Sequence, residues 1–310
     1  MQTSLRIMMK ERYVLENNII NTEIPKAIET VTYRNDMLKL FAILTMLIDH
    51  IGYMFFPKYR IFRTIGRLAF PIFAYQLSVG YIKTSNLKKY ASRLLSFALI
   101  SQIPYSFFSP NLKFEPFNLN IMFTLLSALG ILYVYDMGAA KIKSFKISKN
   151  YTELFFAAAS FLGVFTMLIV PEILEVISNG KFSLEYGVYG LLMILVFHIY
   201  KDKKASMVIS YALLSMFYAY FTAVKVLAAD SLKIVWTYLF SFSTVWEKIL
   251  YLGGGLPRLE GFFFQSRSMF ALIPIYTFEL SEIRIKINKY IGYLFYPVHI
   301  TVLLIIAKFI

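Results

Sequence analysis

Long runs of apolar residues, separated by short polar stretches, recur along almost the entire chain. A helix of about twenty residues is roughly 30 Å long, which matches the hydrocarbon thickness of a bilayer. The pattern predicts membrane-spanning helices at 38–57, 61–82, 91–108, 119–136, 152–171, 184–200, 205–224, 261–280 and 289–309. We therefore expect an all-α, polytopic integral membrane helical bundle with about 9–10 transmembrane helices.

Lysine and arginine residues are concentrated in three of the short polar stretches, near 83–93, 141–149 and 201–204. These alternate with less basic stretches, so the positive-inside rule places them, and the N-terminus, in the cytoplasm. The basic stretch 281–289 follows the same rule only if the interrupted apolar run 232–252 is not a full span. We therefore expect nine full spans, with 232–252 lying at or re-entering the outer face.

Composition supports a multi-pass protein of the cell membrane. The 310 residues are 58% hydrophobic and only 16% charged, whereas soluble domains carry about 25% charged residues. The net charge of +14 lies mainly in loops, so it indicates membrane orientation and argues against nucleic acid as a partner. The chain has no cysteine and three histidines, which argues against a metal site and excludes disulfides and a cysteine acyl-enzyme.

Two regions differ in character. Residues 1–36 have mixed charge and lack the apolar core of a signal peptide, so we expect a cytoplasmic N-terminal extension. Residues 37–310 form the transmembrane domain.

The adjacent residues Asp49 and His50 interrupt the first apolar run. A charged residue at the centre of a membrane helix costs roughly 2.5–3.5 kcal/mol on insertion scales, so such residues face a partner or a polar cavity. They point about 100° apart on a helix, so they do not pair with each other. We expect Arg67 to pair with Asp49 through its guanidinium fork, leaving His50 to face a cavity, toward His299.

The predicted topology places most buried polar residues at one depth, in the outer half of the membrane. This layer includes Asp49, His50, Arg67, Asn120, Glu185 and His299. A histidine there suits a general base, because its ordinary pKa lies near neutrality. The alternatives are structural: a helix-locking Asp49–Arg67 ion pair and satisfied core histidines at positions 50 and 299. His198, at the cytoplasmic end of its helix, is interpreted as an interface residue.

Three short motifs in this layer carry a resemblance to a known family. They are Ile-Asp-His-Ile-Gly at 48–52, Gly-Arg-Leu-Ala-Phe-Pro at 66–71 and Phe-Tyr-Pro-Val-His at 295–299. With matching segments between them, the chain resembles the TraX family over residues 37–309. These are integral membrane proteins tied to N-terminal acetylation of conjugative pilin. The chain carries Gln102 where members often have Glu.

The resemblance implies a membrane acyltransferase that moves acetyl from cytoplasmic acetyl-CoA to an amine or hydroxyl outside. A pilin-like peptide or a surface glycan would be the acceptor, and membrane lipids would surround the protein. His50 would take the acceptor's proton, Asp49 and Arg67 would hold the site together, and Arg67 or Asn120 would stabilise the oxyanion. His299 would position the acceptor or assist proton transfer. The CoA phosphates would bind near Lys83, Lys88, Lys89 or Arg93.

Two other functions fit the same residues. Membrane-embedded Asp, His and Arg also suit a proton-coupled transporter, although no internal repeat is visible between the two halves. A non-enzymatic membrane component of a conjugation or surface assembly would need these residues only for its fold.

Overall fold

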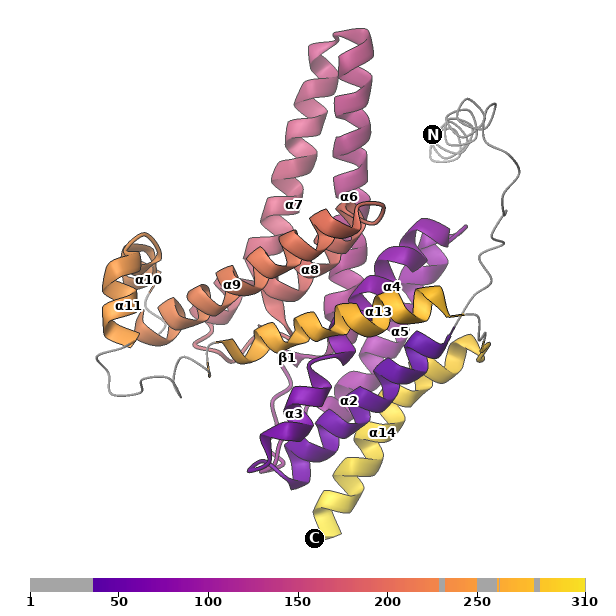
Figure 1. The fold of residues 1–310 in the computed structure, drawn as a ribbon, viewed down its shortest axis with the longest axis vertical. Coiled ribbons are helices and arrows are strands. Elements are labelled where there is room, and N and C mark those ends of the chain that lie inside the picture. Colours follow the sequence, from indigo (N-terminus) through magenta and orange to yellow (C-terminus); the bar gives the residue numbers. More distant parts are fainter. Residues whose placement is uncertain (1–35, 229–231, 250–260, 262, 282–284, 310) are drawn as a thin grey trace. The chain divides into compact units, whose positions relative to one another are not determined.

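The computed structural model describes residues 36–228, 232–249, 261, 263–281 and 285–309. The expected N-terminal extension therefore lies outside the described residues, apart from Asp36. Helices and strands follow one another as α2 (Met37–Phe55), α3 (Arg60–Gly66), α4 (Ala69–Lys83), α5 (Leu87–Tyr105), β1 (Asn118–Leu119), α6 (Ile121–Ser148), α7 (Tyr151–Ile177), β2 (Ser183–Leu184), α8 (Gly187–Ile199), α9 (Lys204–Ala228), α10 (Leu232–Leu239), α11 (Phe242–Ile249), the 3₁₀ helix η2 (Phe263–Ala271), α13 (Leu272–Leu280) and α14 (Lys289–Phe309) (Figure 1).

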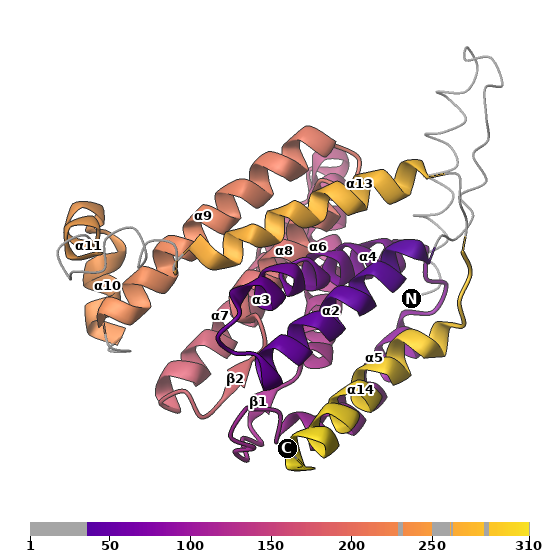
Figure 2. The same cartoon turned by 60° about the horizontal axis from the view of Figure 1, so that its bottom comes forward.

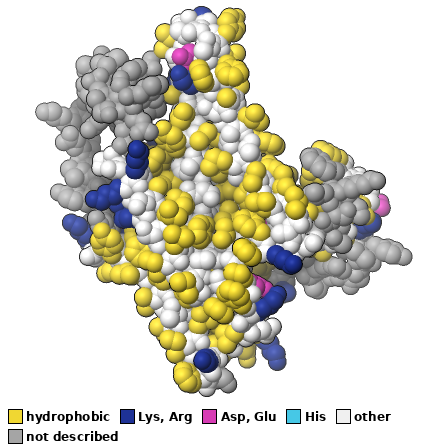
Figure 3. Space-filling model, turned by 180° about the vertical axis from the view of Figure 1, so that it is seen from behind, with side chains coloured by type: hydrophobic (Ala, Val, Ile, Leu, Met, Phe, Trp, Pro, Cys, Tyr) yellow, Lys and Arg dark blue, Asp and Glu magenta, His cyan; other side chains and the backbone are white. Residues whose placement is uncertain are grey.

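The protein is an all-α membrane bundle, as its sequence predicts. Five of the described helices, α2, α6, α7, α9 and α14, are long and apolar enough to cross a membrane. Hydrophobic side chains are spread over the whole described face in Figure 3, while Lys and Arg side chains are few. Because α7 buries little of its surface inside the protein, much of its apolar side is available to lipid.

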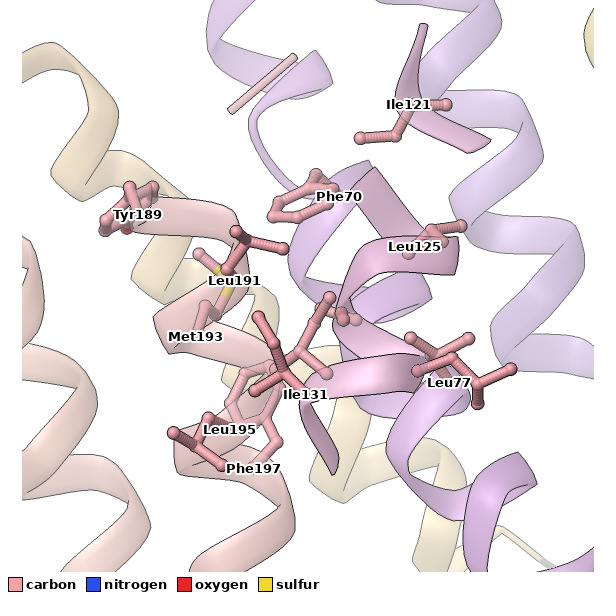
Figure 4. Packing of buried hydrophobic residues seen from close by; sticks show 14 of the residues in the cluster. Phe70, Leu77, Ile121, Leu125, Ile131, Tyr189, Leu191, Met193, Leu195 and Phe197 are labelled. Atoms are coloured by element: carbon pink, nitrogen blue, oxygen red, sulfur yellow. The ribbon is translucent and has the colours of Figure 1, made fainter. Parts of the chain in front are cut away.

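The main core lies where α4, α6 and α8 pack together. Phe70 and Leu77 of α4, Ile131 of α6, and Leu191 and Phe197 of α8 are almost fully buried there (Figure 4). α8 is apolar on all sides, and its neighbours α4, α6, α7 and α9 surround it. A helix that is apolar all round is expected in such an interior position.

The apolar run predicted as one helix over 61–82 forms two helices. α3 ends at Gly66, and α4 starts at Ala69 after a short turn. The break comes before Pro71 and not at it, because Pro71 lies in the first turn of α4, where a missing backbone N–H breaks no helical hydrogen bond. This break gives Arg63 and Arg67 different environments.

The hairpin of α6 and α7 is longer than predicted. α6 continues to Ser148, so most of the basic stretch 141–149 is helix and only Lys149, with a left-handed φ of 55°, ends it. The two helices pack closely where Gly138 faces Ser160, since an added Cβ at Gly138 would lie 3.1 Å from the Ser160 Cβ. A helix of 28 residues is about 42 Å long, which exceeds the hydrocarbon thickness.

The starts of α2 and α14 lie at the same end of the bundle. The Asp36 backbone N–H donates to the Ile285 carbonyl at 2.8 Å, and the Ile287 N–H donates to the Asp36 carboxylate at 3.0 Å. α2 and α14 run side by side from there, with α5 against α14 (Figure 2). We call this end, which also holds the α4–α5 and α8–α9 turns, the basic end.

The apolar run 232–252 contains two short helices where it is described. α10 and α11 have eight residues each, about 12 Å of helix, and neither can cross a bilayer. This agrees with the expectation that 232–252 is not a full span. Residues 250–252 lie outside the described part, and the total of nine spans stays a prediction.

A two-residue parallel strand pair joins segments that are far apart in the sequence. Asn118 in β1 pairs with Ser183 in β2, and the Ser183 hydroxyl also donates to the Asn118 side chain at 2.7 Å. The Glu185 N–H donates to the Leu119 carbonyl at 3.1 Å. The pair thereby holds the starts of α6 and α8 together, beside the buried polar residues.

Candidate functional site

Two buried histidines from opposite ends of the sequence meet between α2 and α14. His50 Nδ1 lies 2.7 Å from His299 Nε2, and the two rings stack with centroids 4.9 Å apart. Only 8% of His50 and 5% of His299 is exposed. Phe108 packs against His50 with ring centroids 4.9 Å apart, which helps to fix the ring in place. The structure thus brings together the two histidines that the sequence places at one depth.

The hydrogen bonds of this pair assign its protons. His299 Nδ1 lies 2.7 Å from the Phe295 carbonyl, which only accepts, so Nδ1 carries a hydrogen. In neutral His299 the Nε2 atom is then an acceptor, and His50 Nδ1–H donates to it. His50 Nε2 is left with a free lone pair and has no partner among the described residues. A histidine held in this tautomer is prepared to accept a proton at Nε2.

Asp49 pairs with Arg63 and not, as the sequence suggested, with Arg67. An Arg63 side-chain N–H donates to Asp49 Oδ2 at 2.7 Å, and the Arg63 guanidinium lies 5.0 Å from the centre of the Tyr53 ring. Gly66 permits the close approach, because a Cβ there would lie within 2.2 Å of the Asp49 side chain. The expected partner was wrong because α3 ends at Gly66, so Arg67 leaves the face that meets α2.

Arg67 instead contacts the segment before α13. Its guanidinium donates to Gln265 Oε1 at 2.7 Å, and it lies 5.4 Å from the centre of the Phe264 ring. A parallel contact joins Arg267 to Thr64 at 2.8 Å. These bonds fasten η2 to α3 next to the histidine site. Within the described part of the chain, Arg67 Nε and Gln265 Nε2 are buried donors without a hydrogen-bond partner.

A small cavity of about 50 Å³ opens beside the histidines. His50, Asp49, Gly66 and Glu185 line it, together with apolar residues of α2, α4 and α6 and the rings of Tyr186 and Tyr296. Its volume is enough for a few water molecules. The cavity therefore brings two carboxyl groups and one imidazole together between apolar walls.

Asn120 is a structural cap. Its side-chain amide donates to the Ala98 carbonyl and to Gln102 Oε1, each at 2.8 Å, and its Oδ1 accepts from the Met122 N–H at 3.0 Å. Both amide hydrogens are therefore used, which argues against an oxyanion role for Asn120; that role stays a prediction. Gln102 fills a position in this same network, also bonding the Asn118 carbonyl at 2.8 Å.

The four basic residues predicted to bind the CoA phosphates lie away from the cavity. Lys83 ends α4, Lys88 and Lys89 lie in the first turn of α5, and Arg93 follows one turn later, with its guanidinium 5.6 Å from the Tyr90 ring centre. None of the four lines the cavity. About ten residues of α4, roughly 15 Å, separate Lys83 from the nearest cavity residue on that helix.

Sequence reasoning missed two residues and underrated a third. Arg63 lies in an Arg-x₃-Arg pair with Arg67, and the pattern alone gives no reason to choose between them. Gln265 lies in a segment whose sequence resembles an ordinary span. Glu185 is recognisable as a carboxyl at the start of an apolar run, but only the β1–β2 pair shows that it reaches the cavity. His198 is buried between α8 and α6, with Nε2 2.8 Å from Asp136 Oδ1, and its place at the membrane interface stays a prediction.

The fold and site define a helical membrane protein with a buried histidine pair and a carboxylate–arginine pair beside a cavity. In a comparison with known families, residues 34–252 match the family described as TraX protein. The chain belongs to the TraX family, as the motifs around Asp49, His50 and Arg67 suggested.

Two curated relatives are similar to parts of the chain. The probable fimbrial assembly protein FimC, serogroup H1, of Dichelobacter nodosus is 29% identical over 191 residues, 58% of this chain and 67% of the relative. An uncharacterised protein of Rickettsia prowazekii is 35% identical over 72 residues, 23% of this chain and 27% of the relative. No solved structure matches the chain.

Proposed function

We propose that this protein is a membrane-embedded acetyltransferase that moves acetyl from acetyl-CoA to an amine or hydroxyl group of an extracytoplasmic acceptor. The observation that carries the proposal is the buried His50–His299 pair, which leaves His50 Nε2 unbonded on a residue that lines a cavity. Buried histidines inside a membrane bundle are costly, and an oriented pair with a free lone pair is an arrangement used for general base catalysis. The likeness to a fimbrial assembly protein supports a pilin-like peptide as the acceptor.

In the proposed reaction, His50 Nε2 removes a proton from the acceptor as its nitrogen or oxygen attacks the thioester carbonyl. The C–S bond then breaks, the acetyl group stays on the acceptor, and the CoA sulfur takes up a proton. His299 holds His50 in the required tautomer and shares the positive charge that forms on the pair. The Asp49–Arg63 pair stabilises the packing of α2 against α3. The unbonded Nε–H of Arg67 would stabilise the oxyanion once the substrate brings the carbonyl oxygen within reach of it.

The donor would bind from the basic end. Lys83, Lys88 and Lys89 are exposed there and suit the CoA phosphates. The pantetheine arm of CoA would have to extend along α4 to bring its thioester to the cavity, because the lysines themselves lie too far from it. The membrane topology proposed here places this basic end in the cytoplasm, where acetyl-CoA is found.

The test is acetyl transfer from radiolabelled acetyl-CoA by the purified full-length protein in lipid nanodiscs, with the wild type compared with His50→Ala. We expect CoA release by the wild type and a loss of at least about 10²-fold in the variant. His198→Ala serves as the matched control, because His198 lies outside the cavity. Wild-type protein that is folded and releases no CoA would overturn the proposal.

A further inference from the structure

Glu185 is a half-buried carboxyl group at the start of α8, beside the cavity. It lies in the turn between β2 and α8 and lines the same cavity as His50 and Asp49. No lysine or arginine of the described residues lies within salt-bridge distance of its carboxyl, whereas Asp49 has Arg63. An unpaired carboxylate in such a place is costly unless it carries a proton or has a function.

The carboxyl group of Glu185 is surrounded by tyrosine hydroxyl groups and by one ion pair. The Tyr296 hydroxyl donates to Glu185 Oε2 at 3.4 Å. Tyr105 and the Ile121 backbone also hydrogen-bond to this carboxyl, and Tyr186 lies near it. The charged groups facing it are Asp49, Arg63 and, beyond Tyr186, Arg67. The Asp49–Arg63 pair is close to neutral as a unit, so it offers Glu185 little compensation for a negative charge.

Tyr296 also connects Glu185 to the histidines. Its ring centroid lies 5.7 Å from that of His299 and 6.4 Å from that of His50, and the ring is almost fully buried. The cavity is therefore bordered by a proton acceptor, His50, and a separate carboxyl, Glu185, in different environments. In active sites, two titratable groups in contrasting environments often take the separate roles of acid and base.

We propose that Glu185 is the general acid of the transfer reaction, giving its proton to the CoA sulfur as the C–S bond breaks. This inference rests on the proposed acetyltransferase function. His50 gains the proton of the acceptor, Glu185 loses its own to the sulfur, and the products are the acetylated acceptor and the CoA thiol. A proton passing from His50 to Glu185 restores both residues. The apolar walls make a bare thiolate costly in the cavity, which is the reason for an acid there.

The test compares Glu185→Gln with the wild type on two acetyl donors. Acetyl-CoA has a basic leaving group, whereas p-nitrophenyl acetate has a leaving group that departs without a proton. We expect Glu185→Gln to lose at least about 10²-fold in kcat with acetyl-CoA and little with p-nitrophenyl acetate, and to lose the alkaline limb of its pH profile. Glu115→Gln, in an exposed ion pair with Lys113, is the matched control. Equal losses on both donors would overturn the proposal.

A second measurement does not depend on turnover. Infrared spectra of the full-length protein at neutral pH should contain a protonated carboxyl band that disappears in Glu185→Gln and remains in Glu115→Gln and His50→Ala. Absence of this band from the wild type would overturn the acid role while leaving the acetyltransferase proposal intact. A band in a wild-type protein that transfers no acetyl would remove both proposals, so the two failures are distinguishable.

Discussion

His50 Nδ1 and His299 Nε2 lie 2.7 Å apart, although 249 positions separate the two residues in the chain. The bond has a direction, because the Phe295 carbonyl fixes the hydrogen of His299 on Nδ1. His50 is thereby the residue with the free lone pair, and His299 is the residue that orients it. The two histidines should therefore respond differently to substitution.

Substitutions of His299 should show whether it orients His50 or itself removes the proton. His299→Gln can still accept a hydrogen bond from His50 Nδ1, so we expect it to keep more acetyl transfer than His299→Leu, which cannot. Both should exceed His50→Ala, which loses the base and at least about 10²-fold in rate. The measurement is kcat per folded protein for the three variants. An inactive His299→Leu variant, together with a His50→Ala variant that retains normal turnover, would reverse the assignment.

The Asp49 partner can be identified by double-mutant cycles on thermal stability. Asp49 and Arg63 are in contact, so the cycle Asp49→Asn with Arg63→Gln should give a coupling energy of about 1–3 kcal/mol. The cycle of Asp49→Asn with Arg67→Gln should give a smaller coupling energy, because Arg67 bonds Gln265 and not Asp49. A larger coupling to Arg67 than to Arg63 would contradict the observed pairing.

Gly66 should tolerate no side chain. An added Cβ would lie 2.1 Å from Asp49 Oδ1, so Gly66→Ala must push α3 away from α2. We expect a loss of stability of about 1–3 kcal/mol, measured by thermal unfolding in detergent. Gly163→Ala is the control, since its nearest atom, Val134 Cγ1, is at an ordinary 3.5 Å. Equal stability of the two variants would show that α3 packs differently.

Asn120→Ala should affect folding and leave chemistry intact. It removes the N-cap of α6 and leaves Gln102 Oε1 without its side-chain donor, so we expect a stability loss of about 1–2 kcal/mol. Activity per folded molecule should change little, because both Asn120 amide hydrogens are already bonded. A large drop in kcat at unchanged stability would support the oxyanion role.

The absence of native cysteine makes membrane orientation directly measurable. Lys88→Cys lies at the basic end and Lys113→Cys at the opposite end, and both side chains are exposed. We expect a membrane-impermeant thiol reagent to label Lys113→Cys in right-side-out vesicles and Lys88→Cys only in inside-out vesicles. The reverse pattern would place the N-terminus outside and remove the proposed route for acetyl-CoA.

The apolar runs and the isolated polar residues within them determine the fold class and identify the residues that need partners. Apolar runs near twenty residues determine an all-α bundle, because only helices satisfy their backbone hydrogen bonds within lipid. The cost of burying Asp49, His50 and His299 marks them as residues that need partners, and their predicted depths place them together. Element boundaries were less certain where a helix leaves the membrane, as α6 shows by continuing through its lysines.

Tertiary structure decided which partner each polar residue takes. The sequence gives no reason to prefer Arg63 or Arg67 as the partner of Asp49. Because the helix breaks after Gly66, Arg63 bonds Asp49 and Arg67 bonds Gln265. Asn120 became a cap, and Glu185 became a cavity residue, because β1 and β2 pair across 65 positions. Hydrophobic pattern fixes which residues are buried, but a hydrogen bond requires atoms within about 3 Å, and only the packing of helices distant in sequence sets such distances.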